Sequence, residues 1–456
     1  MRTPKRRPSR SVQTPVTVGI ATLVAVAGWV AACTPAAGSD PGSRASGAPV
    51  APSSPQIPAA SSAPPAATVP SPADPLPDAS PAPASAPPRH EGPLSHFYDA
   101  LAGLEAGGRK EHVRILWLGD SHAQADFWPD GIRAGLGRRF GKAGPGFLHL
   151  GMKSYRHAGT KIAIRGKWRM RPKQPSTVEP WGDGAFGLGG ILHAGFAEQR
   201  VAEIELTDES LEGKELAVDL CYKFGLPHDA FELYLGDELV ETFRAGGNDA
   251  VGELRHHQAT VTGLTRIEVR IKDGRPDFCG LTVETEPSVH PGVVLDNLGI
   301  NGARYGTALA WSEAAWSVEV KRRPPDLFIF EYGGNEASDM PSAPATYGKQ
   351  ARELMARARR IVPEASCWVI APSDRADVES RMPAIVQAME RAASDAGCAF
   401  WNTYEVMGGK GSLRRWRDLD KAAEDGIHLK PKGYAEVSAL MLGDLMKGYR
   451  APVSSP

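Results

Sequence analysis

The sequence predicts an α/β fold in which a parallel sheet is interrupted by an inserted antiparallel β-sandwich. Short apolar runs followed by helical patterns occur at 113–140 and again from 293 to 446, which is the rhythm of βαβ units around a buried parallel sheet. Between these two parts, apolar and polar residues alternate in short segments separated by turns, as in antiparallel strands that bury one face. At 456 residues the chain is long enough for more than one such domain.

The N-terminal 90 residues are predicted to lie outside the folded part. Four basic residues between positions 5 and 10 precede an apolar run that ends in Val30-Ala31-Ala32-Cys33, which resembles a bacterial lipobox. We therefore expect a signal peptide over 1–33 and lipidation of Cys33; a plain signal peptide or an uncleaved anchor is the alternative. Residues 34–90 are rich in Pro, Ala and Ser and contain no Phe, Trp or Tyr, so they should form an extended tether. These features predict a secreted, periplasmic or cell-envelope lipoprotein that meets the membrane through its lipid anchor only.

The α/β domain is predicted in two parts, over 91–154 and 289–450. Its expected strands lie at 113–118, 293–300, 326–331, 367–371 and 399–403. Its expected helices lie at 94–104, 132–140, 303–318, 345–361, 378–396 and 431–446. Because ligands of such sheets bind beyond the carboxyl ends of the strands, the residues that follow each strand are the candidates for a site.

The inserted β-sandwich is predicted over 155–288, and it holds two of the cysteines. Cys221 and Cys279 lie in this β-rich stretch, whereas Cys367 and Cys398 each open an apolar, strand-like run of the α/β part. Apart from Cys33 these four are an even number, as expected in an oxidising compartment. We therefore expect the disulfides Cys221–Cys279 and Cys367–Cys398, with buried free thiols as the alternative.

Charge and composition exclude several kinds of partner. The 52 basic and 53 acidic residues give a formal net charge of -1, without the basic excess typical of nucleic-acid-binding proteins. The sequence has no Cys or His cluster with metal-ligand spacing. We expect no nucleic acid, no metal and no cofactor.

A serine directly follows the first predicted strand, in Gly119-Asp120-Ser121-His122. A serine at that turn is presented at the carboxyl edge of the sheet, and the amides of a helix that begins there favour developing negative charge. Short polar turns after strands are common, so this signal is weak by itself.

A serine hydroxyl needs a base, and the base needs orientation. Asp425-Gly426-Ile427-His428 lies just before the last predicted helix, and its three-residue offset lets a carboxylate and an imidazole converge from one loop. Taken separately, each would be an ordinary loop residue. His122 is a poorer candidate for the base, because neighbouring residues on a turn point in different directions; we expect it to pack or to contact substrate.

Two glycine- and asparagine-containing turns follow the second and third predicted strands. They are Gly299-Ile300-Asn301-Gly302 and Gly333-Gly334-Asn335-Glu336. A backbone amide of glycine and an Asn side-chain amide are suitable donors to the oxyanion of an acyl-transfer reaction. Each turn could equally be an ordinary connection between a strand and a helix.

The order Ser, Gly, Asn and Asp-x-x-His resembles the SGNH hydrolase superfamily, over roughly 110–150 and 290–450. The resemblance implies a flavodoxin-like, three-layer SGNH hydrolase domain with Ser121 as nucleophile and His428 as base, oriented by Asp425. It also implies an oxyanion hole made by the Ser121 amide, Gly302 and Asn335, with Gly299 as the alternative to Gly302. Glu336 stands where many relatives have Asp.

A finer resemblance involves 119–127, Arg133 and 140–147, which look like bacterial peptidoglycan O-acetylesterases. Those enzymes also carry a carbohydrate-binding-module-like sandwich inserted in the SGNH domain. The resemblance implies a serine esterase that removes O-acetyl groups from the C6 hydroxyl of N-acetylmuramic acid through an acetyl-serine, so the expected partner is O-acetylated peptidoglycan. The alternatives are an acetyltransferase or another carbohydrate or lipid esterase of the SGNH type, and a non-catalytic, cell-wall-binding lipoprotein.

The tryptophans divide by their position. Trp128 is close to Ser121 in sequence, so it is the expected lining of an acyl pocket. Four others are expected in the core rather than as sugar platforms: Trp181, Trp311, Trp316 and Trp401.

Overall fold

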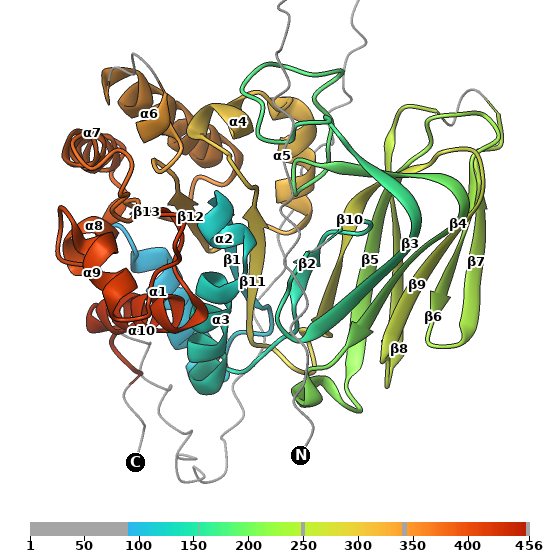
Figure 1. The fold of residues 1–456 in the computed structure, drawn as a ribbon. Coiled ribbons are helices and arrows are strands. Elements are labelled where there is room, and N and C mark those ends of the chain that lie inside the picture. The colour runs from blue at the N-terminus through green and yellow to red at the C-terminus, as the bar shows by residue number, and fades with distance from the viewer. Residues whose placement is uncertain (1–89, 154, 248–250, 340–343, 453–456) are drawn as a thin grey trace, which may run out of the picture. The chain divides into compact units, whose positions relative to one another are not determined.

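The computed structural model describes residues 90–153, 155–247, 251–339 and 344–452 (Figure 1). The expected signal peptide, Cys33 and all but the last residue of the expected tether lie outside the described residues. Within the described ranges, the helices are all too short or too polar to cross a membrane.

The α/β part contains a five-stranded parallel sheet, as predicted. In spatial order its strands are β11 (Val293–Gly299), β1 (Val113–Gly119), β12 (Leu327–Glu331), β13 (Ser366–Ile370) and β14 (Ala399–Trp401). Taken along the chain, this is the order 2-1-3-4-5 of flavodoxin-like folds, in which the topological switch point lies between the first and third strands. Here that point lies between β1 and β12.

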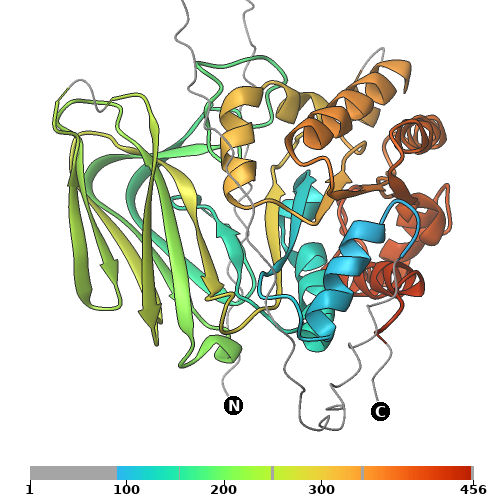
Figure 2. The ribbon, with the colours of Figure 1, turned by 180° about the vertical axis from the view of Figure 1, so that it is seen from behind.

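Helices cover both faces of this sheet, which makes three layers (Figures 1 and 2). One face packs against α1 (Ser95–Glu105), α3 (Phe127–Phe140), α9 (Ser412–Asp418) and α10 (Pro431–Lys447). The other packs against α4 (Tyr305–Leu309), α5 (Glu313–Arg322), α6 (Pro344–Ile361) and α7 (Met382–Asp395). The alternation of side chains along β1 explains this: Ile115 and Trp117 belong to the first core, Leu116 and Leu118 to the second.

Some helices differ from the prediction. The helix expected over 303–318 is divided into α4 and α5, because Ser312 leaves the helical conformation and caps α5, with its Oγ accepting from Ala315 N at 3.3 Å. Three further short helices were not predicted, α2 (Ser121–Gln124), α8 (Thr403–Val406) and α9 (Ser412–Asp418), since four to seven residues are too few to show a helical period.

The inserted part is a large antiparallel sheet that curls around a core of its own (Figure 1). Its strands are β2 (Gly146–Leu148), β3 (Thr160–Arg171), β4 (Leu192–Leu206), β5 (Glu215–Lys223), β6 (Ala230–Leu235), β7 (Glu238–Arg244), β8 (Leu254–Thr262), β9 (Arg266–Asp273) and β10 (Asp277–Thr285). The long strand β4 pairs with β10 near its start and with β9 near its end, so hydrogen bonds join all nine strands in one sheet. The antiparallel character is as predicted; the likeness to a carbohydrate-binding module stays a prediction.

Both expected disulfides are confirmed. Cys221–Cys279 joins the neighbouring strands β5 and β10, and Cys367–Cys398 joins β13 to the residue just before β14. The first disulfide belongs to the same apolar cluster as Trp316 of α5. The inserted sheet is therefore packed directly on the α/β part.

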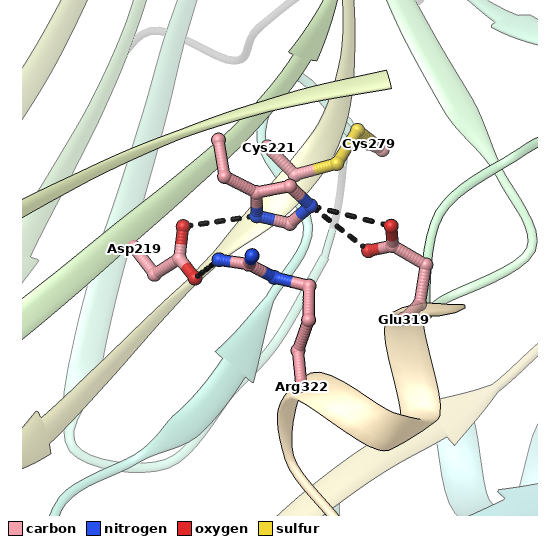
Figure 3. Close-up of a disulfide and its surroundings, with 6 residues drawn as sticks. Asp219, Cys221, Cys279, Glu319 and Arg322 are labelled. Atoms are coloured by element: carbon pink, nitrogen blue, oxygen red, sulfur yellow. Dashed lines mark hydrogen bonds and ion pairs between the residues drawn. A yellow bond between two sulfur atoms is a disulfide. The ribbon is translucent and has the colours of Figure 1, made fainter. Parts of the chain in front are cut away.

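A charged cluster accompanies this contact (Figure 3). His256 of β8 lies 2.9 Å from Asp219 through Nδ1 and 3.1 Å from Glu319 of α5 through Nε2, and Arg322 lies 2.6 Å from Asp219. Burial alone would lower the pKa of His256, but the two carboxylates raise it to about 9. Cys221, His256 and Glu319 are grouped closely enough for a metal, but the sulfur of Cys221 is consumed by its disulfide, so this cluster is an ion-pair contact.

Candidate active site

The candidate residues follow three strands whose carboxyl ends lie side by side. Gly119 of β1 pairs with Gly299 of β11 and with Glu331 of β12. The turns that carry Ser121, Gly302 and Asn335 therefore start at one level of the sheet, beside its switch point.

The turn from β1 to α2 is held by two acidic side chains. Asp120 caps α2 by accepting from His122 N at 2.9 Å, and Asp120 N donates to Glu331 Oε2 at 3.2 Å. A Cβ atom on Gly119 would lie 2.6 Å from both Ala123 Cβ and Glu331 Oε2, so only glycine fits. Burial raises the pKa values of both Asp120 and Glu331. This tight turn presents the side chain of Ser121 at the edge of the sheet.

The three residues expected to form a triad lie together. Ser121 Oγ is 2.7 Å from His428 Nε2, and His428 Nδ1 is 2.7 Å from Asp425 Oδ2. The other oxygen of Asp425 accepts from the backbone amides of Ile427 and His428 at 2.9 and 3.0 Å. Although burial raises the pKa of Asp425, these hydrogen bonds lower it below its ordinary value. The carboxylate is thus ionised, and it holds the imidazole with one nitrogen facing the hydroxyl.

The imidazole and the carboxylate of this triad are open to solvent, and Ser121 is partly exposed. His428 and Asp425 are 36% and 46% exposed. A substrate on the surface of the protein therefore has direct access to them.

Asn335 connects two of the candidate turns. Its Nδ2 donates to Ala303 O at 3.0 Å, next to Gly302, and to Asp120 Oδ2 at 3.2 Å, next to Ser121. Its amide is therefore placed between the nucleophile turn and the glycine turn, where an oxyanion donor is needed.

Of the two candidate glycines, Gly302 is the better placed. Gly299 is the buried end of β11, and its amide already donates to Asn297 Oδ1 at 3.0 Å. Gly302 lies in the turn itself, partly exposed, with φ of 78°, in the left-handed region that favours glycine.

Glu336 joins two of the candidate turns, which the sequence did not indicate. It is fully buried; Oε1 accepts from Tyr305 N and Oε2 from Gly333 N, both at 2.9 Å. One carboxyl group thus joins the start of α4, just beyond Gly302, to the turn that carries Asn335. Burial raises the pKa of Glu336 to about 7. Its position beside Asn335 in the motif was the only available signal.

His122 is a packing residue. It is 4% exposed, and its Nδ1 lies 2.9 Å from the hydroxyl of Tyr434. Burial, with the nearby His428, lowers the pKa of His122 to about 3, so it stays neutral behind the site.

Two expectations about tryptophans are wrong. Trp128 is 1% exposed and packs against Trp117 in the core, so it lines no acyl pocket. Trp181 is 43% exposed, because it lies in a loop of the inserted part rather than in an element. The other three, Trp311, Trp316 and Trp401, are buried as expected.

A model of the GDSL-like lipase/acylhydrolase family matches residues 272–436. The match includes Gly302, Asn335 and the Asp425–His428 loop, but not Ser121, which precedes the inserted sheet. A search of curated proteins gave no significant match.

Among solved structures, a peptidoglycan O-acetylesterase is similar with a TM-score of 0.64 and 23% identity, over 78% of this chain and 97% of that chain. The α/β part alone is too short to account for this coverage, so the shared fold extends into the inserted sheet. A lipase/acylhydrolase from Enterococcus faecalis has a TM-score of 0.29 and 20% identity, over 36% of this chain and 80% of that one. A family two carbohydrate esterase from Clostridium thermocellum, in complex with cellohexaose, has a TM-score of 0.27 and 8% identity, over 63% and 98%.

The family match and the geometry of the site agree on one chemistry. The matched segment contains Gly302, Asn335 and the Asp425–His428 loop, and His428 lies 2.7 Å from the hydroxyl of Ser121 at the start of α2. Residues 272–436 therefore match the GDSL-like lipase/acylhydrolase family, the chain resembles a peptidoglycan O-acetylesterase in fold, and it is a carboxylic ester hydrolase.

Proposed function

We propose that this chain is a serine esterase that removes O-acetyl groups from a cell-wall glycan, namely the C6 O-acetyl groups of N-acetylmuramic acid in peptidoglycan. The observation that carries the proposal is the continuous hydrogen-bonded path from Ser121 Oγ through His428 to Asp425, at 2.7 Å for each step. It makes an ordinary hydroxyl able to attack a carbonyl carbon.

The proposed reaction has two halves. Neutral His428 takes the proton of Ser121 as its oxygen attacks the acetyl carbonyl, and Asp425 stabilises the imidazolium that forms. The tetrahedral oxyanion accepts hydrogen bonds from the amides of Ser121 and Gly302 and from Asn335 Nδ2. His428 then protonates the sugar alcohol as it leaves. In the second half His428 activates a water, which releases acetate and restores the serine.

The choice of a glycan rests on the fold and on the open site. The similar peptidoglycan O-acetylesterase shares the inserted sheet as well as the hydrolase domain. The exposure of His428 and Asp425, each more than a third, suits a polymer whose acetyl groups project from a chain. In this proposal the inserted sheet is a carbohydrate-binding-module-like domain that holds the glycan beside the triad.

The location proposed is the cell envelope. Two disulfides are typical of proteins from oxidising compartments, and the lipobox-like Cys33 with its tether would keep the esterase within reach of the wall.

The test is acetate release from purified sacculi. We expect the wild-type protein to release acetate from O-acetylated sacculi and none from chemically de-O-acetylated sacculi, and Ser121→Ala to release none from either. Chitooligosaccharides added as acceptors separate hydrolysis from acetyl transfer. Hydrolysis of 4-nitrophenyl acetate without any release from O-acetylated sacculi would retain the esterase and reject this substrate.

A further inference from the structure

One stretch of this nearly neutral chain is strongly basic. Between positions 131 and 178 there are twelve Lys and Arg residues and no Asp or Glu. The stretch includes β3, which lies at an edge of the inserted sheet and pairs with β4.

The two halves of β3 differ in how their charge is compensated. In the first half, Lys161 pairs with Glu205 of β4 at 3.1 Å, and Arg165 approaches Glu203 at 3.9 Å. In the second half, the residues of β4 opposite Lys167 and Arg169 are Phe196 and Ala194. Arg171, at the end of this half, pairs with Asp277 of β10 at 3.2 Å, but Lys167 and Arg169 have no acidic residue opposite them on β4.

A cavity of about 720 Å³ opens beside this second half. It is lined by Gly151, Met152, Lys153, Trp168, Arg169, Met170 and Lys173. Lys153, Arg169 and Lys173 are exposed, and no carboxylate of the described residues lies within ion-pair distance of them. The Arg169 guanidinium lies over the Phe196 ring at 4.3 Å. Trp168 packs on Gly151 and is only half-buried, so the cavity combines an aromatic wall with three cations that have no carboxylate partner among the described residues.

The cavity adjoins the proposed oxyanion hole. Gln124, three residues after Ser121, contacts the lining residue Met152 at 3.6 Å, and its Oε1 accepts from Asn301 N, next to Gly302. On the other side, Ser176 follows the lining residue Lys173 closely, and its Oγ would lie 3.3 Å from a Cβ on Gly302. A polymer that enters the site beside Gly302 can therefore extend into this cavity.

We propose that this cavity, defined by Met152, Lys153, Trp168, Arg169, Met170 and Lys173, is a subsite that binds carboxylate groups carried by the glycan substrate. It deepens the proposed function and rests on it. Cationic side chains bind carboxylates through charge-assisted hydrogen bonds, and the Trp168 ring offers an apolar surface to the sugar or to the stem that bears the charge. The site thereby selects carboxylate-bearing glycans over neutral acetylated glycans of the same backbone.

Binding is tested without turnover, in Ser121→Ala protein. The probes are a disaccharide–tetrapeptide fragment of peptidoglycan, the same disaccharide without peptide, and neutral N,N′-diacetylchitobiose. The triple variant Lys153→Gln/Arg169→Gln/Lys173→Gln should bind the carboxylate-bearing fragment about 10-fold more weakly, as expected for lost charge-assisted hydrogen bonds, and chitobiose equally well. The peptide-free disaccharide, whose one carboxylate is on its lactyl group, tells whether the glycan or the peptide supplies the charge.

A control variant separates this site from general electrostatics. Lys161→Gln/Lys349→Gln/Lys410→Gln removes the same charge from exposed positions outside the cavity lining, and it should leave fragment binding unchanged. Raising the salt concentration should weaken fragment binding by the parent and not by the cavity variant. The proposal is overturned if the parent does not bind the fragment, if both triple variants weaken it equally, or if chitobiose binding falls in parallel.

An activity arm distinguishes this proposal from the proposed function. The cavity variant, made with Ser121 intact, should hydrolyse 4-nitrophenyl acetate at the wild-type kcat/KM, because that ester is small and uncharged. If Ser121→Ala retained full esterase activity, the proposed function would fail, while the binding comparison would still decide whether the cavity takes carboxylates.

Discussion

The side-chain amide of Asn335 lies 3.2 Å from Oδ2 of Asp120, the residue directly before Ser121. The two residues are 215 positions apart. The contact ties the orientation of the proposed oxyanion donor to the turn that presents the nucleophile. Since Asn335 Nδ2 also donates to Ala303 O at 3.0 Å, both of its hydrogens have partners in the free protein. A developing oxyanion has to replace one of them.

The first prediction concerns this donor. Asn335→Ala should lower kcat by about 10²–10³-fold, the usual cost of losing one oxyanion donor, with KM for 4-nitrophenyl acetate little changed. The measurement is steady-state kinetics, with thermal unfolding to show that the variant is folded. An equal loss in Asn301→Ala, whose side chain is exposed in the neighbouring turn, would show that the effect comes from disturbing the loops and would remove the donor role.

The triad should show an order of effects. Ser121→Ala and His428→Ala should each lower kcat by at least about 10³-fold, and Asp425→Ala by less than either, since the carboxylate acts only through the imidazole. The partial exposure of Asp425 lets water replace part of its contribution. Initial rates with 4-nitrophenyl acetate measure this order. A double variant Ser121→Ala/His428→Ala no worse than either single variant would show that the residues act as one unit, whereas additive losses would contradict the triad.

Glu336 is predicted to act by positioning. Glu336→Gln keeps one of the two acceptors that join Tyr305 N and Gly333 N, so the loops that carry Gly302 and Asn335 should loosen and kcat should fall between about 10- and 100-fold. Because KM reports binding and not these loops, it should change little. Unchanged kcat in a folded Glu336→Gln protein would show that the bridge does not position the site.

The same variant has a pH signature. Burial raises the pKa of Glu336 from 4.5 to about 7 in the folded protein, so the folded state favours the protonated form. The stability from this group is present below pH 4.5 and is lost as the pH rises through 7. Wild-type Tm should therefore fall more between pH 4.5 and 7 than the Tm of Glu336→Gln, as thermal unfolding at several pH values would show.

The sequence predicted the sheet and the proximity of Ser121 to the Asp425–His428 loop because both leave local signals. The bounds of the five predicted strands lie within two residues of the observed ones. Ser121 directly follows a predicted strand, and His428 directly precedes a predicted helix. The Cys pairs were predictable for the same reason, since each cysteine marked a strand. The resemblance to SGNH hydrolases then predicted that turns distant in the chain form one site.

What the sequence did not show depends on three-dimensional placement. The bridge made by Glu336 follows from its full burial between two turns. The spacing of apolar and polar residues in the sequence does not indicate this burial. Trp128 was expected near the acyl group because it is near Ser121 in sequence, but the helix α3 turns its indole into the core. His256 had no partner at metal spacing in the sequence, yet folding brings Asp219 and Glu319 to its two nitrogens.

The last prediction concerns that histidine and the contact between the inserted sheet and α5. His256 has a pKa of about 9 in the folded protein against 6.5 in the unfolded chain, so its ion pairs with Asp219 and Glu319 stabilise the fold fully below pH 6.5. This stabilisation decreases above pH 6.5 and is lost as the pH rises through 9. The difference in Tm between the wild type and His256→Gln should therefore be largest near pH 6 and small above pH 9. His257→Gln, at the next position of β8, is the matched control, since His257 contacts Glu241 of the inserted sheet itself and not α5. A Tm difference for His256→Gln that stays constant from pH 6 to above 9 would mean that His256 holds the contact by packing alone, and that its charge contributes nothing.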